Sequence, residues 1–208
     1  MLIYALSDTH NLHNKVEIPE CDLIIHAGDA TGRGSMEELI PFLNWYSKQK
    51  SKYKVLIPGN HDWGFQHMTD FYRLQCQERG ISLLIDEMVE LDGLKIYGSP
   101  ITPYFCNWAF NRFPGPEIQE HWDKIPSGMD IIVTHGPCYQ ILDMNALMQN
   151  CGCDQLLSKL LEAKPKAHIC GHLHENYGLK EFMDIKFYNV ALCNEQYRIA
   201  EKPMEIIL

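Results

Sequence analysis

The chain has 208 residues, of which 46% are hydrophobic, and we expect one domain that covers residues 1–208. Its 27 acidic and 18 basic residues give a formal net charge of −9, which disfavours long nucleic acid as a partner because that affinity comes largely from neutralised phosphates. Signal-peptide features and apolar runs of membrane-spanning length are absent, so we expect a cytoplasmic protein without a membrane partner. The eight cysteines include no CxxC pair and are expected to be reduced thiols.

Five short apolar runs predict buried strands, and each run leads directly into a polar cluster. They cover residues 1–7, 21–26, 53–57, 130–134 and 167–170. Runs of this length bounded by glycine and proline are typical of interior strands that are covered on both faces.

Helical patterns lie between these runs. Ser35, with Glu38 three residues later, resembles a capping box and predicts a helix start, with a kink or a late start expected at Pro41. Residues 69–79 and 154–163 predict two further helices. The alternation of strands and helices indicates a layered α/β domain.

Turn signals predict two hairpins and one long loop. Asp92-Gly93 between two short apolar runs predicts a hairpin, and residues 182–189 resemble another hairpin arm. Residues 100–116 are rich in aromatic residues, proline and glycine and predict a long ordered loop, a kind of segment that often contacts substrate.

Polar residues that bind metals follow all five predicted strands. They form the islands Asp8-Thr9-His10, Gly28-Asp29, Gly59-Asn60-His61-Asp62, Thr134-His135-Gly136 and Gly171-His172-Leu173-His174. Ligands bind outside the carboxyl ends of strands in open α/β sheets, so these islands are expected to meet in one crevice. Two carboxylates, one amide and four imidazoles provide ligands for two divalent ions that share one carboxylate.

The types of ligand also indicate which ions and which chemistry to expect. Mixed oxygen and nitrogen ligands favour manganese, with iron, zinc, nickel and magnesium as alternatives. An aspartate can bridge two ions if its two oxygens bind separately. Two ions roughly 3.5–4 Å apart activate a water and hold the phosphoryl oxygens, which is the chemistry of phosphate-ester cleavage.

The ordered motifs D-x-H, GD, GNHD, TH and GHxH, from Asp8 to His174, resemble the calcineurin-like metallophosphoesterase superfamily. The resemblance implies an α/β fold of four layers, an α-β-β-α sandwich in which helices flank two mixed sheets. It implies two divalent metal ions per chain, bridged by Asp29. The remaining ligands implied are Asp8, His10 and His174 for the first ion and Asn60, His135 and His172 for the second.

The resemblance also implies catalytic roles. A hydroxide that bridges the ions is expected to attack phosphorus, and His61 is expected to protonate the leaving oxygen rather than bind metal. Asn60 would also contact a phosphoryl oxygen. Asp62 would orient His61 or another ligand through a hydrogen bond.

Four further segments are similar to the brain-type metallophosphoesterase-domain proteins, which are related to class III cyclic-nucleotide phosphodiesterases. These segments are residues 96–103, 107–111, 134–137 and 174–178. The similarity implies a phosphodiesterase for a small substrate such as a cyclic nucleotide. Some members carry glycine where this chain has His172, and the imidazole here favours a complete two-metal site. Asp62 and the absence of Asp-Arg-Gly after Asp29 also favour a diesterase over a protein phosphatase.

Two residues in the 100–116 loop are candidate substrate contacts. Trp108 suits stacking on a base, and Arg112 suits a phosphate, while loop packing and a surface salt bridge are the respective alternatives. His26 is expected to be a core histidine. A phosphomonoesterase or protein phosphatase is the alternative function, because the same metal core acts on both ester types, and a non-catalytic scaffold is less favoured. The sequence specifies no oligomeric state.

Overall fold

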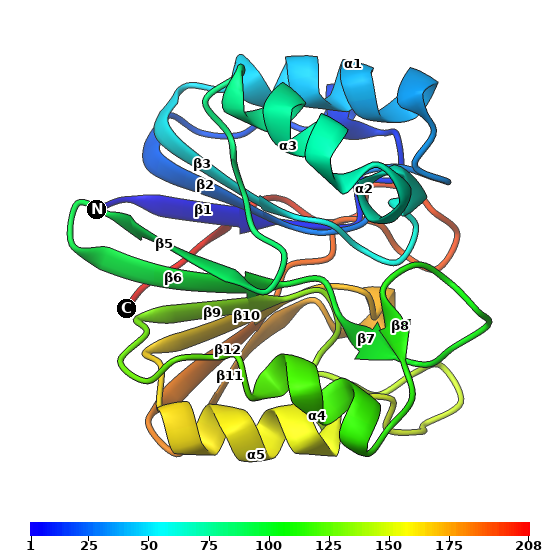
Figure 1. The fold of residues 1–208 in the computed structure, drawn as a ribbon, viewed down its shortest axis with the longest axis vertical. Coiled ribbons are helices and arrows are strands. Elements are labelled where there is room, and N and C mark those ends of the chain that lie inside the picture. Colours follow the sequence, from blue (N-terminus) through cyan, green and yellow to red (C-terminus); the bar gives the residue numbers. More distant parts are fainter.

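Two β-sheets pack face to face in the computed structural model, which describes residues 1–208, and helices cover the outer face of each sheet (Figure 1). The first sheet consists, in spatial order, of β13 (Met204–Glu205), β1 (Ile3–Leu6), β2 (Cys21–Ala27), β3 (Ser51–Ile57) and β4 (Ser82–Leu83). The second consists of β11 (Gly178–Phe182), β12 (Ile185–Asn189), β10 (Ala167–Cys170), β9 (Ile131–Thr134), β6 (Leu94–Ser99) and β5 (Glu87–Leu91).

Helices complete the outer layers. α1 (Met36–Ser47) and α3 (Thr69–Gln77) lie over the first sheet, and α4 (Pro116–Trp122) and α5 (Asp154–Ala163) lie over the second (Figure 1). The shorter elements are α2 (Trp63–His67), β7 (Thr102–Pro103), β8 (Asn111–Arg112) and the 3-10 turns η1 (His13–Lys15) and η2 (His174–Asn176). The fold is therefore the four-layer α-β-β-α sandwich that the sequence motifs imply.

Both sheets are mixed, and their interior strands are parallel. β1 to β4 are parallel to one another, as are β6, β9, β10 and β12, whereas β13, β11 and β5 pair antiparallel at the edges. The carboxyl ends of the parallel strands point toward the side of the molecule where α2, β7 and β8 lie, away from both chain termini (Figure 1). This arrangement gathers the polar islands on one side.

Alternation along the strands divides the hydrophobic core. In β1, Ile3 and Ala5 belong to a cluster of 16 buried residues that come mainly from the facing strands of both sheets. Leu6 points the other way and packs with residues of α1 such as Phe42. Tyr46 fixes that helix to the sheet, since its hydroxyl lies 3.1 Å from the Ile24 carbonyl oxygen and 2.7 Å from that of Val55.

The predicted elements are largely confirmed. All five predicted strands form, with ends within two residues of those expected. The capping box also forms: the Ser35 amide donates to Glu38 Oε2 at 3.1 Å, and α1 begins at Met36. Of the kink or late start expected at Pro41, the late start does not occur, because Pro41 lies inside the helix. α5 has the predicted bounds, and α3 ends at Gln77, two residues early.

The hairpins depend on left-handed turns. Asp92 and Gly93, with φ of 48° and 82°, join β5 to β6 as predicted. Met183 and Asp184, with φ of 49° and 62°, join β11 to β12, so the second hairpin begins earlier than its predicted arm. The predicted 100–116 loop contains the short strands β7 and β8.

No helix of the chain is long and apolar enough to cross a membrane. All eight cysteines are free thiols, as expected.

His168 in β10 makes the stability of this fold sensitive to acid. It is fully buried, Thr134 Oγ1 lies 2.8 Å from its Nε2, and its Nδ1 has no partner. Burial lowers the pKa of His168 to about 3. The unfolded chain therefore binds one more proton than the folded chain between about pH 6.5 and pH 3, and stability falls as the pH falls through this window.

We predict that His168→Phe weakens the pH dependence of stability. Between pH 6.5 and pH 5, the wild-type free energy of unfolding in urea should fall by about 1.5 kcal/mol more than that of the variant. The comparison of the two proteins isolates His168 from the other histidines. An equal fall in both proteins would show that His168 is not held neutral.

Candidate metal centre

The five polar islands meet at the carboxyl ends of their strands. Asp8 and His10 follow β1, Asp29 follows β2, and Asn60 and His61 follow β3 in the first sheet. His135, His172 and His174 follow β9 and β10 in the second sheet. Four of these ligands adopt left-handed backbone conformations past their strands: Asp8 with φ of 54°, His10 with 39°, Asp29 with 54° and His172 with 69°. Such conformations are unfavourable for side-chain-bearing residues and concentrate at functional sites.

The first cluster of donors consists of Asp8, His10 and His174. Asp8 Oδ1 lies 3.4 Å from His174 Nε2 and 3.9 Å from His10 Nε2. Its other oxygen, Oδ2, accepts hydrogen bonds from the Ser7 hydroxyl at 2.5 Å and the His172 amide at 2.9 Å. Oδ2 is therefore held by hydrogen bonds within the protein, and Oδ1 faces the two imidazoles.

The second cluster consists of Asp29, His135 and His172, and Asn60 adjoins it. His135 Nε2 lies 3.3 Å from Asp29 Oδ2 and 2.9 Å from Asn60 Oδ1. The rings of His135 and His172 pack edge to face with centroids 5.1 Å apart. The structure thus brings together all seven residues that the sequence motifs imply as ligands, and it also places His61 with His10 and Asp29 in a third group that could hold a metal.

Asp29 faces both clusters with a single oxygen. Its Oδ1 accepts the His61 backbone amide at 2.8 Å. Its Oδ2 lies 3.9 Å from His10 Nε2 in the first cluster and 3.3 Å from His135 Nε2 in the second. The geometry therefore differs from the expected bridge through two separate oxygens, because only Oδ2 is free of backbone contacts.

Backbone carbonyls fix which nitrogen each ring offers. Nδ1 lies 3.2 Å from the Thr31 oxygen in His10, 3.0 Å from the Asn194 oxygen in His174 and 2.9 Å from the Ala27 oxygen in His135. A carbonyl only accepts, so each Nδ1 carries a proton and each neutral ring turns an Nε2 lone pair into the site.

These lone pairs face other acceptors. His10 Nε2 and His174 Nε2 are 3.3 Å apart, and His135 Nε2 faces the carbonyl oxygen of the Asn60 amide. Asp8 Oδ1 is fully buried and has no hydrogen-bond donor. Buried acceptors that face one another are unfavourable unless a proton or a metal cation lies between them; without metal, a proton takes this place at His135, and a divalent ion would take it when bound. The residues present therefore fit two bound divalent ions.

Electrostatics keep the carboxylates ionised. Burial alone would raise the pKa of Asp8 and of Asp29, but nearby imidazoles, chiefly His174 for Asp8 and His135 for Asp29, outweigh it and hold both below the ordinary value. Without metal, Asp29 outweighs burial at His135 and raises its pKa to about 9. Burial lowers the pKa of His172 to about 4, so its ring is neutral and able to bind metal.

His61 lies beside the shared carboxylate. Its Nδ1 lies 2.8 Å from the Gly32 carbonyl oxygen, and its Nε2 lies 3.9 Å from Asp29 Oδ2. The Trp108 ring stacks on the imidazole with centroids 4.2 Å apart and an angle of 24° between the planes. These contacts fix the ring and direct Nε2 toward the site.

Asp62 ties two of the islands together. Its buried carboxylate accepts the amides of Gly59 at 2.9 Å, Ala30 at 3.2 Å and Thr31 at 3.0 Å, and the Thr31 hydroxyl at 2.7 Å. It makes no hydrogen bond with the His61 ring. Asp62 therefore positions the loops that carry Asp29 and Asn60, rather than orienting His61 directly.

A cavity of about 650 Å³ opens over the clusters. Trp108 lines it together with Tyr104 and Phe105. Arg112, the other substrate candidate in this loop, does not line the cavity. Its guanidinium donates to His121 Nε2 at 3.1 Å and to the Asn111 carbonyl at 2.8 Å.

Three residues near the C-terminus support the site without any signal in the sequence motifs. Asn189, at the end of β12, donates to the Leu173 carbonyl at 3.0 Å and braces the loop that carries His172 and His174. Asn194 provides the carbonyl that fixes His174, and the Tyr197 ring lies 4.7 Å from that of His10. These residues reach the metal ligands because residues 190–192, which follow β12, form backbone hydrogen bonds with Ser7. His26, by contrast, is a buried core histidine, as expected.

The family model for calcineurin-like phosphoesterases matches residues 1–176 of the chain. The chain belongs to this family. The family is metal-dependent and indicates a phosphoester hydrolase, and the chain carries candidate metal ligands in the matched segment.

Relatives extend the similarity over nearly the whole chain. Human metallophosphoesterase domain-containing protein 1 is 34% identical, with 98% of this chain and 70% of the relative covered. A UPF0046 protein of Caenorhabditis elegans is also 34% identical, with 96% and 78% covered. The fold is similar to that of the Thermus thermophilus protein TT1561, with a TM-score of 0.60, 13% identity and coverage of 90% and 88%.

We predict that calorimetric titration of the metal-free protein with manganese gives a stoichiometry of two. His174→Ala should lose one ion, because it removes a donor from the first cluster alone. Asp29→Asn should weaken both sites, since Oδ2 faces both clusters. His67→Ala, at the exposed end of α2, is the matched control and should bind two ions. Retention of both ions at wild-type affinity by Asp29→Asn would contradict a shared ligand.

Proposed function

We propose that the protein is a dinuclear-metal phosphodiesterase for a small phosphodiester such as a cyclic nucleotide. The observation that carries this proposal is the division of seven donors into two clusters that share Asp29 Oδ2, with His61 beside that oxygen. Two divalent ions held there would supply Lewis acidity and a water of lowered pKa.

The residues of the chain would act in distinct ways. Six ligands divide into two sets of three, and Asp29 belongs to both. The Gly32 carbonyl holds the proton on His61 Nδ1, so the protonated ring presents its second proton at Nε2 toward the leaving oxygen. Stacking on Trp108 limits rotation of that ring.

The cavity supports a small substrate. Its volume of about 650 Å³ is in the range of small-molecule sites, and the net charge of −9 opposes extended polyanions. A phosphomonoesterase or protein phosphatase is the second candidate, because the same donors can act on both ester types. A scaffold without metal is disfavoured by Asp8 Oδ1, which is buried without a hydrogen-bond donor and would be a ligand if a cation is bound.

We predict that His61→Ala keeps two manganese ions and lowers kcat by about 10²–10⁴-fold on diesters with alkoxide leaving groups. The loss should be much smaller with p-nitrophenolate, which departs without protonation. Steady-state kinetics on both substrate types and metal analysis of the same samples would check this. Collapse of metal content in the variant would instead make His61 a ligand.

A paired hydrolysis assay should show manganese-dependent preference for bis-p-nitrophenyl phosphate over p-nitrophenyl phosphate, abolished by chelation. Preference for the monoester would move the assignment to a phosphatase. Absence of both activities in protein shown to hold two ions would contradict the proposed diesterase on these substrates and favour a binding role.

A further inference from the structure

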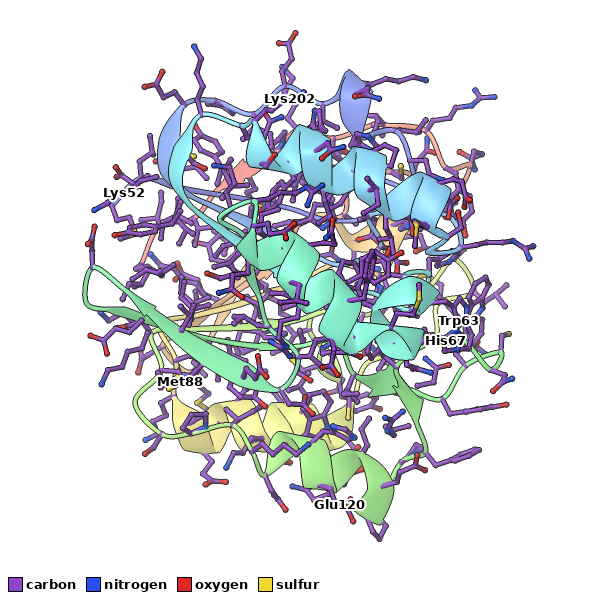
Figure 2. All side chains as sticks on the ribbon, turned by 45° about the horizontal axis from the view of Figure 1, so that its top comes forward. Lys52, Trp63, His67, Met88, Glu120 and Lys202 are labelled. Carbon is purple, nitrogen blue, oxygen red and sulfur yellow. The ribbon has the colours of Figure 1, made fainter.

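The walls of the cavity carry an unusual combination of charges. Among the 18 residues that line it there is no lysine or arginine, although two glutamates, Glu175 and Glu195, lie on the rim. Lys52 and Lys202 lie at the periphery of the fold (Figure 2). Apart from protonated histidines and any metal ions that the two clusters hold, the cavity therefore offers no positive charge to an anionic group of a substrate.

The two glutamates lie beside the His174 side of the centre. Glu175 follows His174 directly, and its Oε1 accepts the Ala146 amide at 3.0 Å. Glu195 follows Asn194, whose carbonyl holds His174 Nδ1. Both carboxylates are exposed.

An aromatic ring lies with them. Tyr197, two residues after Glu195, packs edge to face against His10 at 4.7 Å and against His174 at 5.4 Å. It is half exposed and lines the cavity. Carboxylates beside an aromatic face are the surroundings that bind ammonium groups, through charge attraction and cation–π contact.

The position of His61 indicates which part of a substrate would lie against each side of the cavity. If His61 protonates the leaving oxygen, the leaving group lies toward Trp108, which stacks on His61. The Tyr197 ring lies closer to His10 and His174, at 4.7 Å and 5.4 Å, than to His61, at 6.3 Å. The substituent that stays on phosphorus would then face the part of the cavity wall that Tyr197, Glu175 and Glu195 line on the His174 side. We propose that this wall is a subsite for a cationic ammonium group, so that the preferred substrates are phosphodiesters whose retained alcohol carries an amine or quaternary ammonium. This inference rests on the proposed function.

Two chromogenic diesters with the same leaving group provide the test. p-Nitrophenyl phosphorylcholine carries a quaternary ammonium, and 3,3-dimethylbutyl p-nitrophenyl phosphate is its neutral analogue of the same shape. In each, water adds to phosphorus, the bond to the p-nitrophenyl oxygen breaks, and p-nitrophenolate leaves. Since size and leaving group are shared, the ratio of the two kcat/KM values reports the charge preference.

We expect the manganese-loaded wild type to prefer the cationic diester about tenfold, equivalent to about 1.4 kcal/mol. Glu175→Gln combined with Glu195→Gln should reduce the ratio to about one, because glutamine keeps the acceptor for the Ala146 amide and removes the charge. Glu181→Gln, on the exposed strand β11, is the matched control and should keep the wild-type ratio. A ratio near one in the wild type, or an unchanged ratio in the double variant, would overturn the proposal.

A binding measurement separates this proposal from the catalytic one. Manganese-loaded His61→Ala should bind phosphocholine about tenfold more tightly than 3,3-dimethylbutyl phosphate in calorimetry, and the preference should disappear when both glutamates are replaced. If neither diester is hydrolysed but this preference is found, the diesterase assignment fails and the cationic subsite stands. Equal binding of the two ligands would overturn the subsite even in an active enzyme.

Discussion

The structure depends on the convergence of buried acceptors on one shared oxygen, Asp29 Oδ2. In a metal-free protein some of these groups lack good partners, since His10 Nε2 faces His174 Nε2 at 3.3 Å and Asp8 Oδ1 has no hydrogen-bond donor, whereas His135 holds a proton beside Asp29. Such an arrangement destabilises the folded state unless cations occupy it, and ions that bind only the folded chain stabilise it in return. Bound metal would therefore link folding to metal binding in this protein, and the same residues that weaken the metal-free fold would provide the proposed chemistry.

The scaffold holds this arrangement with backbone groups rather than with long side chains. Parallel strands deliver the islands to one side, and left-handed residues turn the ligands inward within two residues of the strand ends. Carbonyl oxygens set the tautomers of His10, His135 and His174, and the Asp62 carboxylate joins the loops after β2 and β3. Glycine fits where the loops approach most closely: a Cβ on Gly171 would clash with Ser7 and Asp8, and one on Gly59 would clash with Asp29.

Local signals explain what could be predicted from the sequence. The five strands that lead into the islands can be predicted because each contains a short apolar run, and α1 can be predicted from the Ser35–Glu38 capping box. α2 and α4 were missed because elements of five and seven residues are too short to show a helical period. The ligands followed from motif order, since every island comes directly after a strand.

The features that could not be predicted depend on tertiary contacts. Asp62 holds two loops together through Thr31, and Tyr197 packs against His10, although in each pair the residues lie far apart in the chain. Arg112 hydrogen-bonds His121, a partner that competes with any substrate. The single-oxygen geometry of Asp29 depends on one amide, that of His61, which no composition or spacing rule specifies.

The most direct test of the central claim is anomalous diffraction at the manganese edge from crystals grown with manganese. The account predicts two peaks, one on each side of Asp29 Oδ2. One peak should lie among Asp8, His10 and His174, and the other among Asn60, His135 and His172. A single peak, or two peaks of which only one contacts Asp29, would contradict a dinuclear centre built on a shared oxygen.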